Sequence, residues 1–473
     1  MTENRARGWV LVLASIASLM VALDTLVVTT ALSTIRVDLG ASIEELEWTV
    51  NAYNLSFAVL LLTAAGLGDR FGRQRMFVTG VGLFVAASAA CALSGSVGAL
   101  IAARAVQGAG AALVVPLSLA IVSAAFPPER RASAIGILMG VTGLAVASGP
   151  VVGGAIAQGL DWEWIFWLNV PIGLVLIPFV LTKIRESFGP DAALDIRGLT
   201  LATTGALGVV WGLVRGNASG WASLEVVGSL AAGALLLVAF VGWELRAREP
   251  MLPMRFFALR AFSAGNAAAF LSFASLFGAV FFFSQFLQNG LGYGPLQAGV
   301  RQVPWTATLF VCAPIAGALT DRIGERPFMV AGLLLQAIGM GWIALIASPD
   351  MAYGELIAPM IIAGCGVSMA IPGVQSSVVG AVAPEAIGKA AGANSMMRQL
   401  GGVFGIAILV AVFTGAGSYA SPRAFTDGFV PAIVVSAALS LVGAFASAAV
   451  PARRRARETG AIRAVPVLEG DRA

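Results

Sequence analysis

Two charged residues that lie inside long apolar segments are the residues of this sequence best suited to do chemistry. Asp24 lies in the apolar run 9–32, and Arg104 lies in the apolar run 98–124. A charge at the centre of a membrane-crossing helix costs about 2.5–3.5 kcal/mol, so such residues should face a polar interior. Burial disfavours the charged form of a carboxyl group, so Asp24 can bind and release a proton, while a guanidinium group keeps its charge. The pair predicts a carboxyl group whose proton is controlled by a fixed positive charge.

Both residues also have structural alternatives. Asp24 could be a permanent partner of a donor in 98–124, and Arg104 could bond backbone carbonyl groups or extend toward the membrane surface. The position 256 residues after Arg104 is Met360, which concentrates the interior charge in the first half of the chain. Arg398, beside Gln399, is the exception, and we expect it to be a gate or a structural contact more than a substrate ligand.

The residues that most enzymes use are missing. The chain contains no histidine, and Cys91, Cys312 and Cys365 lie in apolar runs without the paired spacing of metal sites or disulfide frameworks. The glycine-rich phosphate-binding loop of ATPases does not occur either. We therefore expect a protein that is not an enzyme, that holds no cofactor, and that draws on an ion gradient with protons as the coupling ion.

The segments that must position these residues are long enough to cross a bilayer. Of the 473 residues, 58% are hydrophobic and 11% are charged, and the mean hydropathy is +0.88. Because about 20 residues make one crossing helix, the sequence predicts an all-α polytopic membrane protein with fourteen spans. They lie at 9–32, 47–68, 76–95, 98–124, 132–158, 164–183, 198–215, 223–243, 262–288, 297–319, 328–347, 355–381, 390–415 and 428–450.

The basic residues orient these spans. With the N-terminus inside, 23 of the 29 lysines and arginines fall on the cytoplasmic side, four fall outside, and Arg104 and Arg398 lie within spans. Because positively charged loops stay in the cytoplasm, we expect a multi-pass protein of the plasma membrane with both termini in the cytoplasm. The basic tail 453–473 should lie against anionic lipid, as a topology anchor more than as a binding tail.

Two stretches of the first half recur in the second. Residues 68–75 align with 320–327 at an offset of 252, and glycines and prolines of 108–136 align with those of 364–392 at an offset of 256. Parallel repeats of this kind build transporters whose substrate binds between two halves. We expect six-helix bundles at 1–185 and 251–452, two inserted helices at 186–250, and the tail at 453–473.

Several motifs resemble the major facilitator superfamily, and specifically its fourteen-span drug:proton antiporters. Residues 65–75 are similar to the superfamily's loop between helices 2 and 3, residues 104–110 to its helix 4 motif, and residues 149–154 to the antiporter motif of drug exporters. The fourteen-span family is indicated by residues 23–28, 48–53 and 162–173. The resemblance covers essentially the whole membrane portion and departs from the usual residues at Thr29, Ser33, Ala145 and Glu163.

The resemblance implies the major facilitator fold and proton-coupled export of hydrophobic or cationic drugs by alternating access, with Asp24 and Arg104 as the coupling residues. It also implies a cytoplasmic latch, in which Asp69 accepts hydrogen bonds from a helix N-terminus and pairs with an arginine such as Arg130. The latch residues are Gly68, Asp69, Arg70, Gly72, Arg73, Arg130, Asp321 and Arg322; these charges could instead only fix the topology. The antiporter motif, with Gly149, Pro150, Gly153 and Gly154, would seal the interface against proton leak.

The substrate cavity should be mostly apolar with a few polar groups. Its candidates are Tyr53, Asn54, Phe57, Gln107, Phe282, Gln285, Gln288, Gln375 and Arg398. The expected partners are a small lipophilic or cationic substrate and membrane lipid, not nucleic acid, and we expect a bacterial protein that acts as a monomer. Two alternatives remain open: an exporter or importer of one specific metabolite, and a membrane sensor or scaffold. The second alternative leaves the cost of burying Asp24 and Arg104 unexplained.

Overall fold

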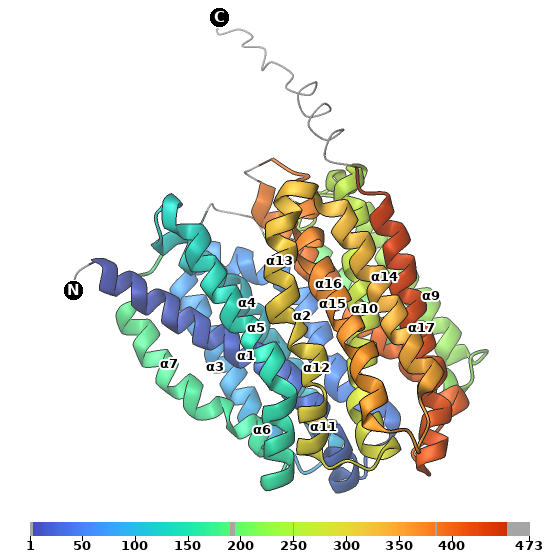
Figure 1. Ribbon diagram of the computed structural model, residues 1–473. Coiled ribbons are helices and arrows are strands. Elements are labelled where there is room, and N and C mark those ends of the chain that lie inside the picture. The colour runs from blue at the N-terminus through green and yellow to red at the C-terminus, as the bar shows by residue number, and fades with distance from the viewer. Residues whose placement is uncertain (1–2, 190–193, 249, 384–385, 452–473) are drawn as a thin grey trace, which may run out of the picture.

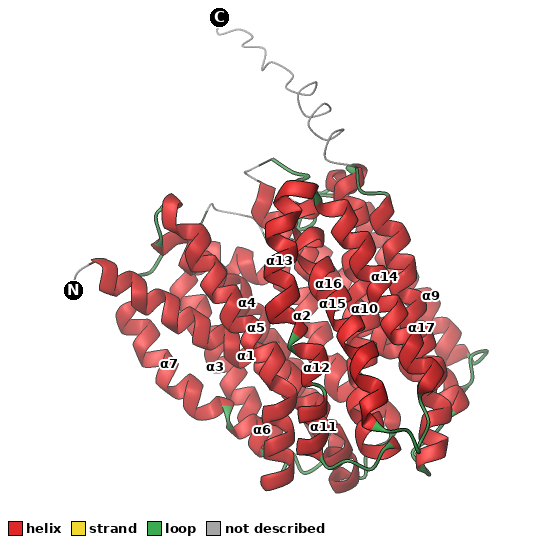
Figure 2. Cartoon of the chain, viewed as in Figure 1, coloured by secondary structure: helices red, strands yellow, loops and turns green. Residues whose placement is uncertain are grey.

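The computed structural model describes residues 3–189, 194–248, 250–383 and 386–451 (Figure 1). Within these ranges the regular secondary structure is entirely helical, without a strand (Figure 2). The predicted all-α membrane fold is therefore confirmed. The predicted domain boundaries fall in the connections that precede α8 and η1, and the predicted tail 453–473 lies outside the described residues.

The helices fall into two bundles that stand side by side, with a pair of helices between them in the sequence (Figure 1). The first bundle comprises α1 (Glu3–Leu39), α2 (Ile43–Phe71), α3 (Arg73–Ala92), α4 (Val97–Ala125), α5 (Pro128–Gly159), α6 (Trp164–Trp167) and α7 (Asn169–Lys183). The intervening pair is α8 (Ile196–Ser219) and α9 (Leu224–Glu244). The second bundle comprises η1 (Met254–Ala258), α10 (Arg260–Gln285), η2 (Phe286–Gly290), α11 (Pro295–Arg301), α12 (Val303–Thr306), α13 (Thr308–Ile323), α14 (Glu325–Ile346), α15 (Tyr353–Val379), α16 (Ile387–Ala416) and α17 (Pro422–Ala448).

Thirteen helical segments of the described chain are long and apolar enough to cross a membrane, and α2 makes a fourteenth if its two parts count as one span. α2 bends by 54° between Ile43–Leu61 and Thr63–Phe71. The predicted spans 164–183 and 297–319 agree with the spans Trp164–Lys183 and Pro295–Thr320 of the structure. Short irregular turns inside them separate α6 from α7, and α11, α12 and α13 from one another.

Local sequence signals explain where several helices begin. Ser42 and Glu45 form a reciprocal capping box at the start of α2, and Ser96 and Ser421 cap α4 and α17. The turns from α2 to α3 and from α13 to α14 each pass through a glycine with a φ of 104°, at Gly72 and Gly324. Because this backbone conformation is strained for other residues, the glycines explain why the sequence repeat at an offset of 252 is a pair of equivalent turns.

The packing of the helices repeats with the same offsets as the sequence. A Cβ atom at Gly108 would lie 2.2 Å from the carbonyl oxygen of Tyr53, and one at Gly364 would lie 2.5 Å from that of Trp305. A Cβ atom at Gly110 would lie 2.9 Å from the carbonyl oxygen of Gly80, and one at Gly366 would lie 2.5 Å from that of Gly332. Backbones can approach this closely only at small residues. The glycine positions therefore fix α4 against α2 and α3, and α15 against α12 and α14.

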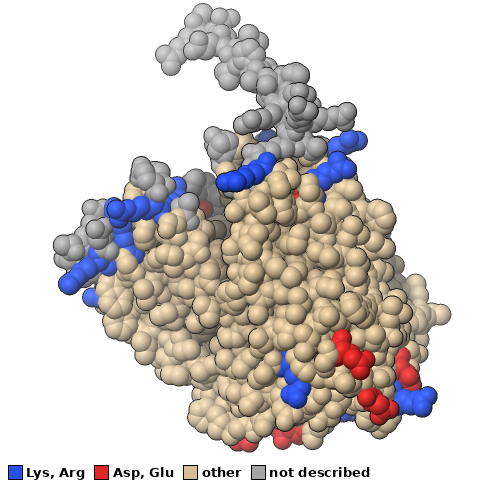
Figure 3. Space-filling view, viewed as in Figure 1, with Lys and Arg blue, Asp and Glu red and all other residues tan. Residues whose placement is uncertain are grey.

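Two ends of the molecule are distinguished by charge. We use the name basic end for the end of the molecule where α1 begins. The arginines around the α2–α3 and α4–α5 connections lie at this end: Arg70, Arg73, Arg75, Arg130 and Arg131. We call the opposite end the far end. Lysine and arginine side chains gather at the basic end of the face shown in Figure 3. α17 also ends at the basic end (Figure 1), which agrees with an even number of crossings.

The two bundles meet mainly at the far end. Gln288 Nε2 donates to the carbonyl oxygen of Thr30 (3.1 Å), Asn289 Nδ2 to Ser33 Oγ (3.1 Å), and the Leu296 amide to Gln158 Oε1 (3.1 Å). Toward the basic end, the described hydrogen bonds between the bundles reduce to Thr63 with Met251, and the surface is hollowed between the bundles there (Figure 3). The structure is therefore closed at the far end and open at the basic end.

The glycine contacts predict a specific pattern of stability. Gly110→Ala and Gly366→Ala should each lower the free energy of unfolding by about 1–3 kcal/mol, because the added methyl group meets backbone atoms that cannot move aside. Thermal unfolding of the purified protein in detergent measures the effect.

Two glycines on the neighbouring helices serve as matched controls. A Cβ atom at Gly82 on α3 or at Gly341 on α14 would meet nothing within 4 Å, so alanine there should leave stability unchanged or raise it slightly. Equal losses in the packed and the open positions would contradict the proposed role of the close contacts.

Candidate functional site

Asp24 and Arg104, the two residues that the sequence singles out, form one buried ion pair. Arg104 Nη1 lies 2.5 Å from Asp24 Oδ2, and each side chain is 1% exposed. The Nε atom of Arg104 donates to the carbonyl oxygen of Thr49 (3.1 Å), so the guanidinium group also holds the backbone of α2. The pair thus joins α1, α2 and α4.

Amide side chains complete the coordination of the carboxylate. Asp24 Oδ1 accepts from Gln107 Nε2 and from Asn169 Nδ2, each at 2.9 Å. Both amides also donate to Ser88 Oγ, at 2.7 Å from Gln107 and 3.2 Å from Asn169. Gln107 Oε1 in turn accepts from Arg104 Nη1 at 2.6 Å. Each carboxylate oxygen therefore has a charged or an amide donor, so the buried carboxyl group is fully hydrogen-bonded.

Aromatic rings cover the guanidinium group. The Arg104 Cζ atom lies 4.2 Å from the centroid of the Tyr53 ring and 5.7 Å from that of Phe166. Tyr53 and Phe166 are both fully buried, so the pair is held away from solvent. A cation over an aromatic face gains further stabilisation when it is desolvated.

This geometry allows a proton to act as a switch. An ionised carboxylate only accepts hydrogen bonds, whereas a protonated carboxyl group carries one donor. Protonation of Asp24 removes the negative charge that faces Arg104 and adds one O–H donor beside the donors Gln107 and Asn169. A proton on this carboxyl group therefore weakens contacts that join α1, α4 and α7.

The paired charges predict a non-additive effect on stability. Asp24→Asn leaves Arg104 as an uncompensated buried cation and should lower stability by about 3–5 kcal/mol. The double variant with Arg104→Gln removes both charges and should recover most of that loss. Thermal unfolding of the three variants, with the exposed Asp350→Asn as a control, checks this. Losses that simply add would contradict a direct interaction.

The loop motif at the basic end differs in its pairing from the expected latch. Asp69 Oδ1 accepts from Arg73 Nη2 at 2.7 Å and from Arg73 Nε at 2.9 Å. The expected pairing of Asp69 with Arg130 is wrong in this conformation, since Arg130 is exposed at the start of α5. Arg73 lies close to Asp69 because it follows four residues later in the chain, on the other side of the turn at Gly72.

The remaining latch positions have separate surroundings. A Cβ atom at Gly68 would lie 2.1 Å from Leu117 of α4, and Arg70 extends over Phe71. In the second bundle Arg322 is exposed, and the side chain of Asp321 lies outside the described residues. The latch itself stays a prediction.

Sequence reasoning missed the residue that anchors this motif. Glu186, which follows α7, accepts from the backbone amides of Gln74 (2.8 Å) and Arg75 (3.2 Å) at the start of α3. A carboxylate at a helix N-terminus satisfies free amides and interacts favourably with the helix dipole. The N-cap residue of α3 is Gly72, which offers no side-chain hydrogen bond to the start of the helix. The missing cap was the sign in the sequence that a residue from elsewhere in the chain caps α3.

The glycine and proline motif of α5 lies at two helix contacts. Cβ atoms at Gly149 and Gly153 would lie 2.7 Å from Leu26 Cβ and 2.2 Å from Thr30 Oγ1 of α1. A Cβ atom at Gly154 would lie 2.4 Å from the carbonyl oxygen of Pro295, which belongs to the second bundle. One at Gly299 of α11 would lie 2.1 Å from that of Pro150. The motif therefore closes the far end of the structure by contact between backbones.

This contact predicts that one methyl group can shift the conformational equilibrium. Gly154→Ala should disfavour the far-end-closed conformation and slow transport several-fold, because the new Cβ meets the backbone of α11. Gly140→Ala on the same helix meets nothing within 4 Å and should leave transport unchanged. The initial rate of transport in vesicles, normalised to the amount of protein, is the measurement; a similar rate in both variants would argue against the seal.

Most of the predicted cavity residues are buried in this conformation. Tyr53 stacks on Arg104, Phe57 packs edge-on against Tyr53, and Gln107 belongs to the ion-pair network. In the second bundle Phe282 stacks on Phe413, and Gln285 accepts a hydrogen bond from Tyr419. In this conformation these residues lie in packed surroundings, which aromatic and amide side chains suit equally well, and their part in a substrate cavity stays a prediction.

The other cavity candidates have mixed surroundings. Gln375 is exposed, and Gln288 joins the bundles through Thr30. Arg398 donates to Ser395 Oγ at 3.2 Å and lies over the ring of Phe273, which makes it a structural contact. Asn54 is 1% exposed, and neither atom of its amide has a partner. Cys312 and Cys365, which the spacing did not pair, come together as free thiols with their sulfur atoms 3.1 Å apart.

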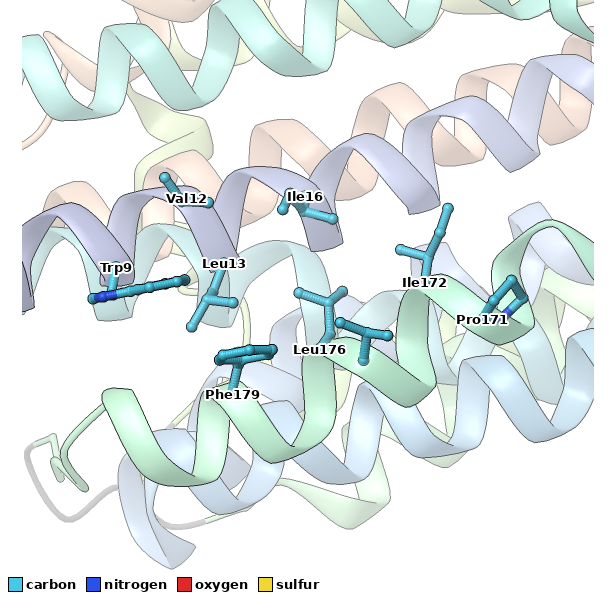
Figure 4. A pocket seen from close by; sticks show the side chains of 9 residues that line it. Trp9, Val12, Leu13, Ile16, Pro171, Ile172, Leu176 and Phe179 are labelled. Carbon is cyan, nitrogen blue, oxygen red and sulfur yellow. The ribbon is translucent and has the colours of Figure 1, made fainter.

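A groove of about 470 Å³ lies on the outside of the first bundle, between α1 and α7 (Figure 4). Trp9 and Phe179 stack across it with ring centroids 5.5 Å apart. Its lining is apolar: Trp9, Val12, Leu13, Ile16, Pro171, Ile172, Val175, Leu176 and Phe179. Such a surface suits contact with lipid chains and offers no group for proton transfer.

The fold and the site define a multi-pass membrane transporter. Two helical bundles repeat one another, the first holds a buried ion pair, and no feature of an enzyme active site accompanies the pair in the described residues. The sequence profile of the Major Facilitator Superfamily matches residues 14–406 and 265–466. The chain therefore belongs to the major facilitator superfamily, whose members are transporters and not enzymes.

Individual relatives agree with this assignment. The chain is 35% identical over 451 residues to the tetracenomycin C resistance and export protein of Streptomyces glaucescens, covering 94% of this chain and 84% of that protein. It is 36% identical over 467 residues to the cephamycin export protein CmcT of Amycolatopsis lactamdurans, covering 97% and 95%. A crystal structure of a POT family transporter in complex with 5-aminolevulinic acid superposes with a TM-score of 0.69 at 15% identity, over 93% of this chain and 95% of that one. The predicted family is confirmed.

Proposed function

We propose that this protein exports small, mostly apolar compounds from a bacterial cell in exchange for protons. The observation that carries the proposal is the buried pair of Asp24 and Arg104, with two amides on the same carboxylate. A fully compensated pair costs less than a lone charge, yet it remains expensive in a membrane protein. A switchable carboxyl group accounts for that cost, and a purely structural role or a sensor does not.

Proton binding and substrate movement are coupled through Arg104. When Asp24 takes up a proton, the guanidinium group loses its counter-charge and its hold on α1, while it still bonds the backbone of α2 through Thr49. The helices of the first bundle then adopt a different arrangement, and the far-end contacts of α1 and α5 with the second bundle change with them. Release of the proton restores the arrangement described above.

The direction of transport follows from the charge distribution. Basic loops stay in the cytoplasm, so the basic end with its hollow faces the cytoplasm, and both termini lie there. The structure then represents a conformation open to the cytoplasm and closed to the outside. A lipophilic compound would enter from the cytoplasm or the inner leaflet and leave after the far end opens.

The proton gradient supplies enough free energy for this work. One pH unit corresponds to about 1.4 kcal/mol per proton, or roughly a tenfold concentration ratio. Each net charge that crosses adds about 2.3 kcal/mol per 100 mV. One proton per cycle can therefore sustain a concentration ratio large enough to protect a cell.

Antibiotics and other drugs are the favoured cargo, because relatives that match most of this chain are described as export or resistance proteins for tetracenomycin C, cephamycin and puromycin. The second candidate is a transporter for one specific metabolite. The number of compounds that the protein moves distinguishes the two.

Transport in proteoliposomes tests the proposal. A pH gradient imposed across the membrane should drive uphill accumulation of lipophilic dyes, and collapse of the gradient by an ionophore should abolish it. Asp24→Asn should reduce gradient-driven transport by about two orders of magnitude, because the carboxyl group that exchanges the proton is gone.

Three outcomes have different meanings. Uphill transport that ignores pH on both faces overturns the proton-coupled mechanism, and an active Asp24→Asn variant overturns the assignment of the site. Transport of one compound out of a broad panel of dyes and antibiotics favours the specific-metabolite alternative. The Asp350→Asn variant, with an exposed carboxyl group altered, controls for the loss of a charge alone.

A further inference from the structure

A second carboxyl group, that of Glu47 on α2, is buried and has no counter-ion. The Glu47 side chain is fully buried. Its Oε1 atom accepts from Asn51 Nδ2 at 3.0 Å, while its Oε2 atom is buried without a partner. In the described residues no lysine or arginine nitrogen lies within 4.0 Å of this carboxyl group. A charge in such a place is strongly disfavoured.

The charged groups around Glu47 do not compensate it. Glu44, one turn earlier on α2, has the same sign and pairs instead with Arg215 of α8 at 3.3 Å. Arg215 is shared with Glu225, at 3.1 Å. Arg36 of α1 lies over the ring of Tyr419, from the connection before α17. Neighbouring charges therefore give the carboxylate form of Glu47 no support.

The hydrogen-bonding pattern points to the protonated form. Glu47 Oε2 and Asn51 Oδ1 are both acceptors, and both are buried without a donor. A proton on the carboxyl group supplies one donor to this pair of side chains. Glu47 and Asn51 can then form a reciprocal acid–amide pair, in which the amide N–H bonds one carboxyl oxygen and the carboxyl O–H bonds the amide oxygen.

Glu47 lies where the two bundles close on each other. α2 packs along α16 of the second bundle, and Leu46 and Val50, next to Glu47, are buried in the apolar core to which α16 also contributes. Trp48, on its other side, packs with Trp211 of α8 at 5.8 Å between ring centroids. Closure of the far end therefore removes water from Glu47, and separation of α2 from α16 returns it.

We propose that Glu47 is a second proton-binding site, distinct from Asp24, and that the far end closes only when Glu47 is protonated. The inference rests on the proposed function for its direction, because the far end faces the outside only in that orientation. The carboxylate takes one proton from the medium at the far end as the bundles close, forming the O–H bond. It returns that proton to the same side on reopening, so the proton controls closure and is not itself transported.

The proposal fixes the sign of a pH dependence. The closed conformation binds one more proton at Glu47 than the open one, so acid at the far end favours closure and alkali favours opening. Glu47→Gln mimics the neutral acid and can still pair with Asn51. This variant should therefore no longer open at its far end as the medium becomes alkaline.

Distance measurements between spin labels on the full chain test the proposal. Leu93 and Leu345 are 73% and 88% exposed, and they occupy equivalent far-end positions at the ends of α3 and α14. Cysteines at these two positions, in a background with Cys91, Cys312 and Cys365 replaced, report the separation of the bundles. The closed fraction of the parent protein should fall by about threefold or more from pH 5.5 to pH 8.5, whereas that of Glu47→Gln, in which Asp24 is the remaining site, should not fall over this range.

A neighbouring acid provides the matched control. Glu45 is the exposed acid of the capping box at the start of α2, and Glu45→Gln should retain the pH dependence of the parent. An infrared band of a protonated carboxyl group, present in the parent at neutral pH and absent in Glu47→Gln, reports the proton directly. This band does not depend on whether the labelled variants transport.

The outcomes separate this proposal from the proposed function. A Glu47→Gln variant whose closed fraction changes with pH as in the parent, or a parent without the carboxyl band, overturns the second proton site even if pH-driven export is found. If the band and the pH-dependent closure are present but transport ignores the pH gradient, the proposed function fails and the proton site stands.

Discussion

Compensation of charge in a medium that solvates ions poorly is the constraint on which the structure depends. Asp24 and Arg104 are tolerated inside the first bundle because each satisfies the other and because Gln107 and Asn169 complete the carboxylate. The carboxylate belongs to α1 and its donors to α4 and α7, and the carbonyl oxygen of Thr49 adds the backbone of α2 as an acceptor for Arg104. Any change at one member therefore acts on several helices. A change at this one carboxyl group, such as the binding of a proton, can therefore affect several helices at once, which a contact between two side chains alone does not do.

Glycine contacts supply the complementary property, which is rigidity within each bundle. α4 touches α2 and α3 through Gly108 and Gly110, and α15 repeats the arrangement through Gly364 and Gly366. Helices that meet backbone to backbone cannot slide past one another without large steric cost. Motion is directed instead to the contacts between the bundles, which consist of a few hydrogen bonds, the seal of α5 on α11 and the apolar packing of α2 on α16. Rigid bundles with movable contacts between them agree with a structure that is closed at the far end and hollowed at the basic end.

Composition, hydropathy and internal sequence similarity were sufficient to predict the helical membrane fold, the two repeated bundles and the pairing of Asp24 with Arg104. The irregular turns inside two of the spans, such as the turn between α6 and α7, could not be predicted, since hydropathy averages over them. The sequence also could not show which cavity candidates face open space, because Phe282 and Gln285 have the same sequence appearance in a packed core as in a binding surface. Glu186 and Glu47 were overlooked for opposite reasons. Glu186 acts through a contact distant in sequence, and Glu47 lies too near the end of its span to look buried.

The second bundle has no counterpart to the ion pair. Met360, buried and apolar, stands on α15 where the repeat would place the equivalent of Arg104. Its core around η2 and α17 is rich in stacked phenylalanines, such as Phe286 on Phe429. Substitutions there alter the shape of the second bundle without touching the ion pair. The two bundles can therefore vary separately: the first must keep its opposite charges matched, while the second can be reshaped by exchanging apolar side chains of different size.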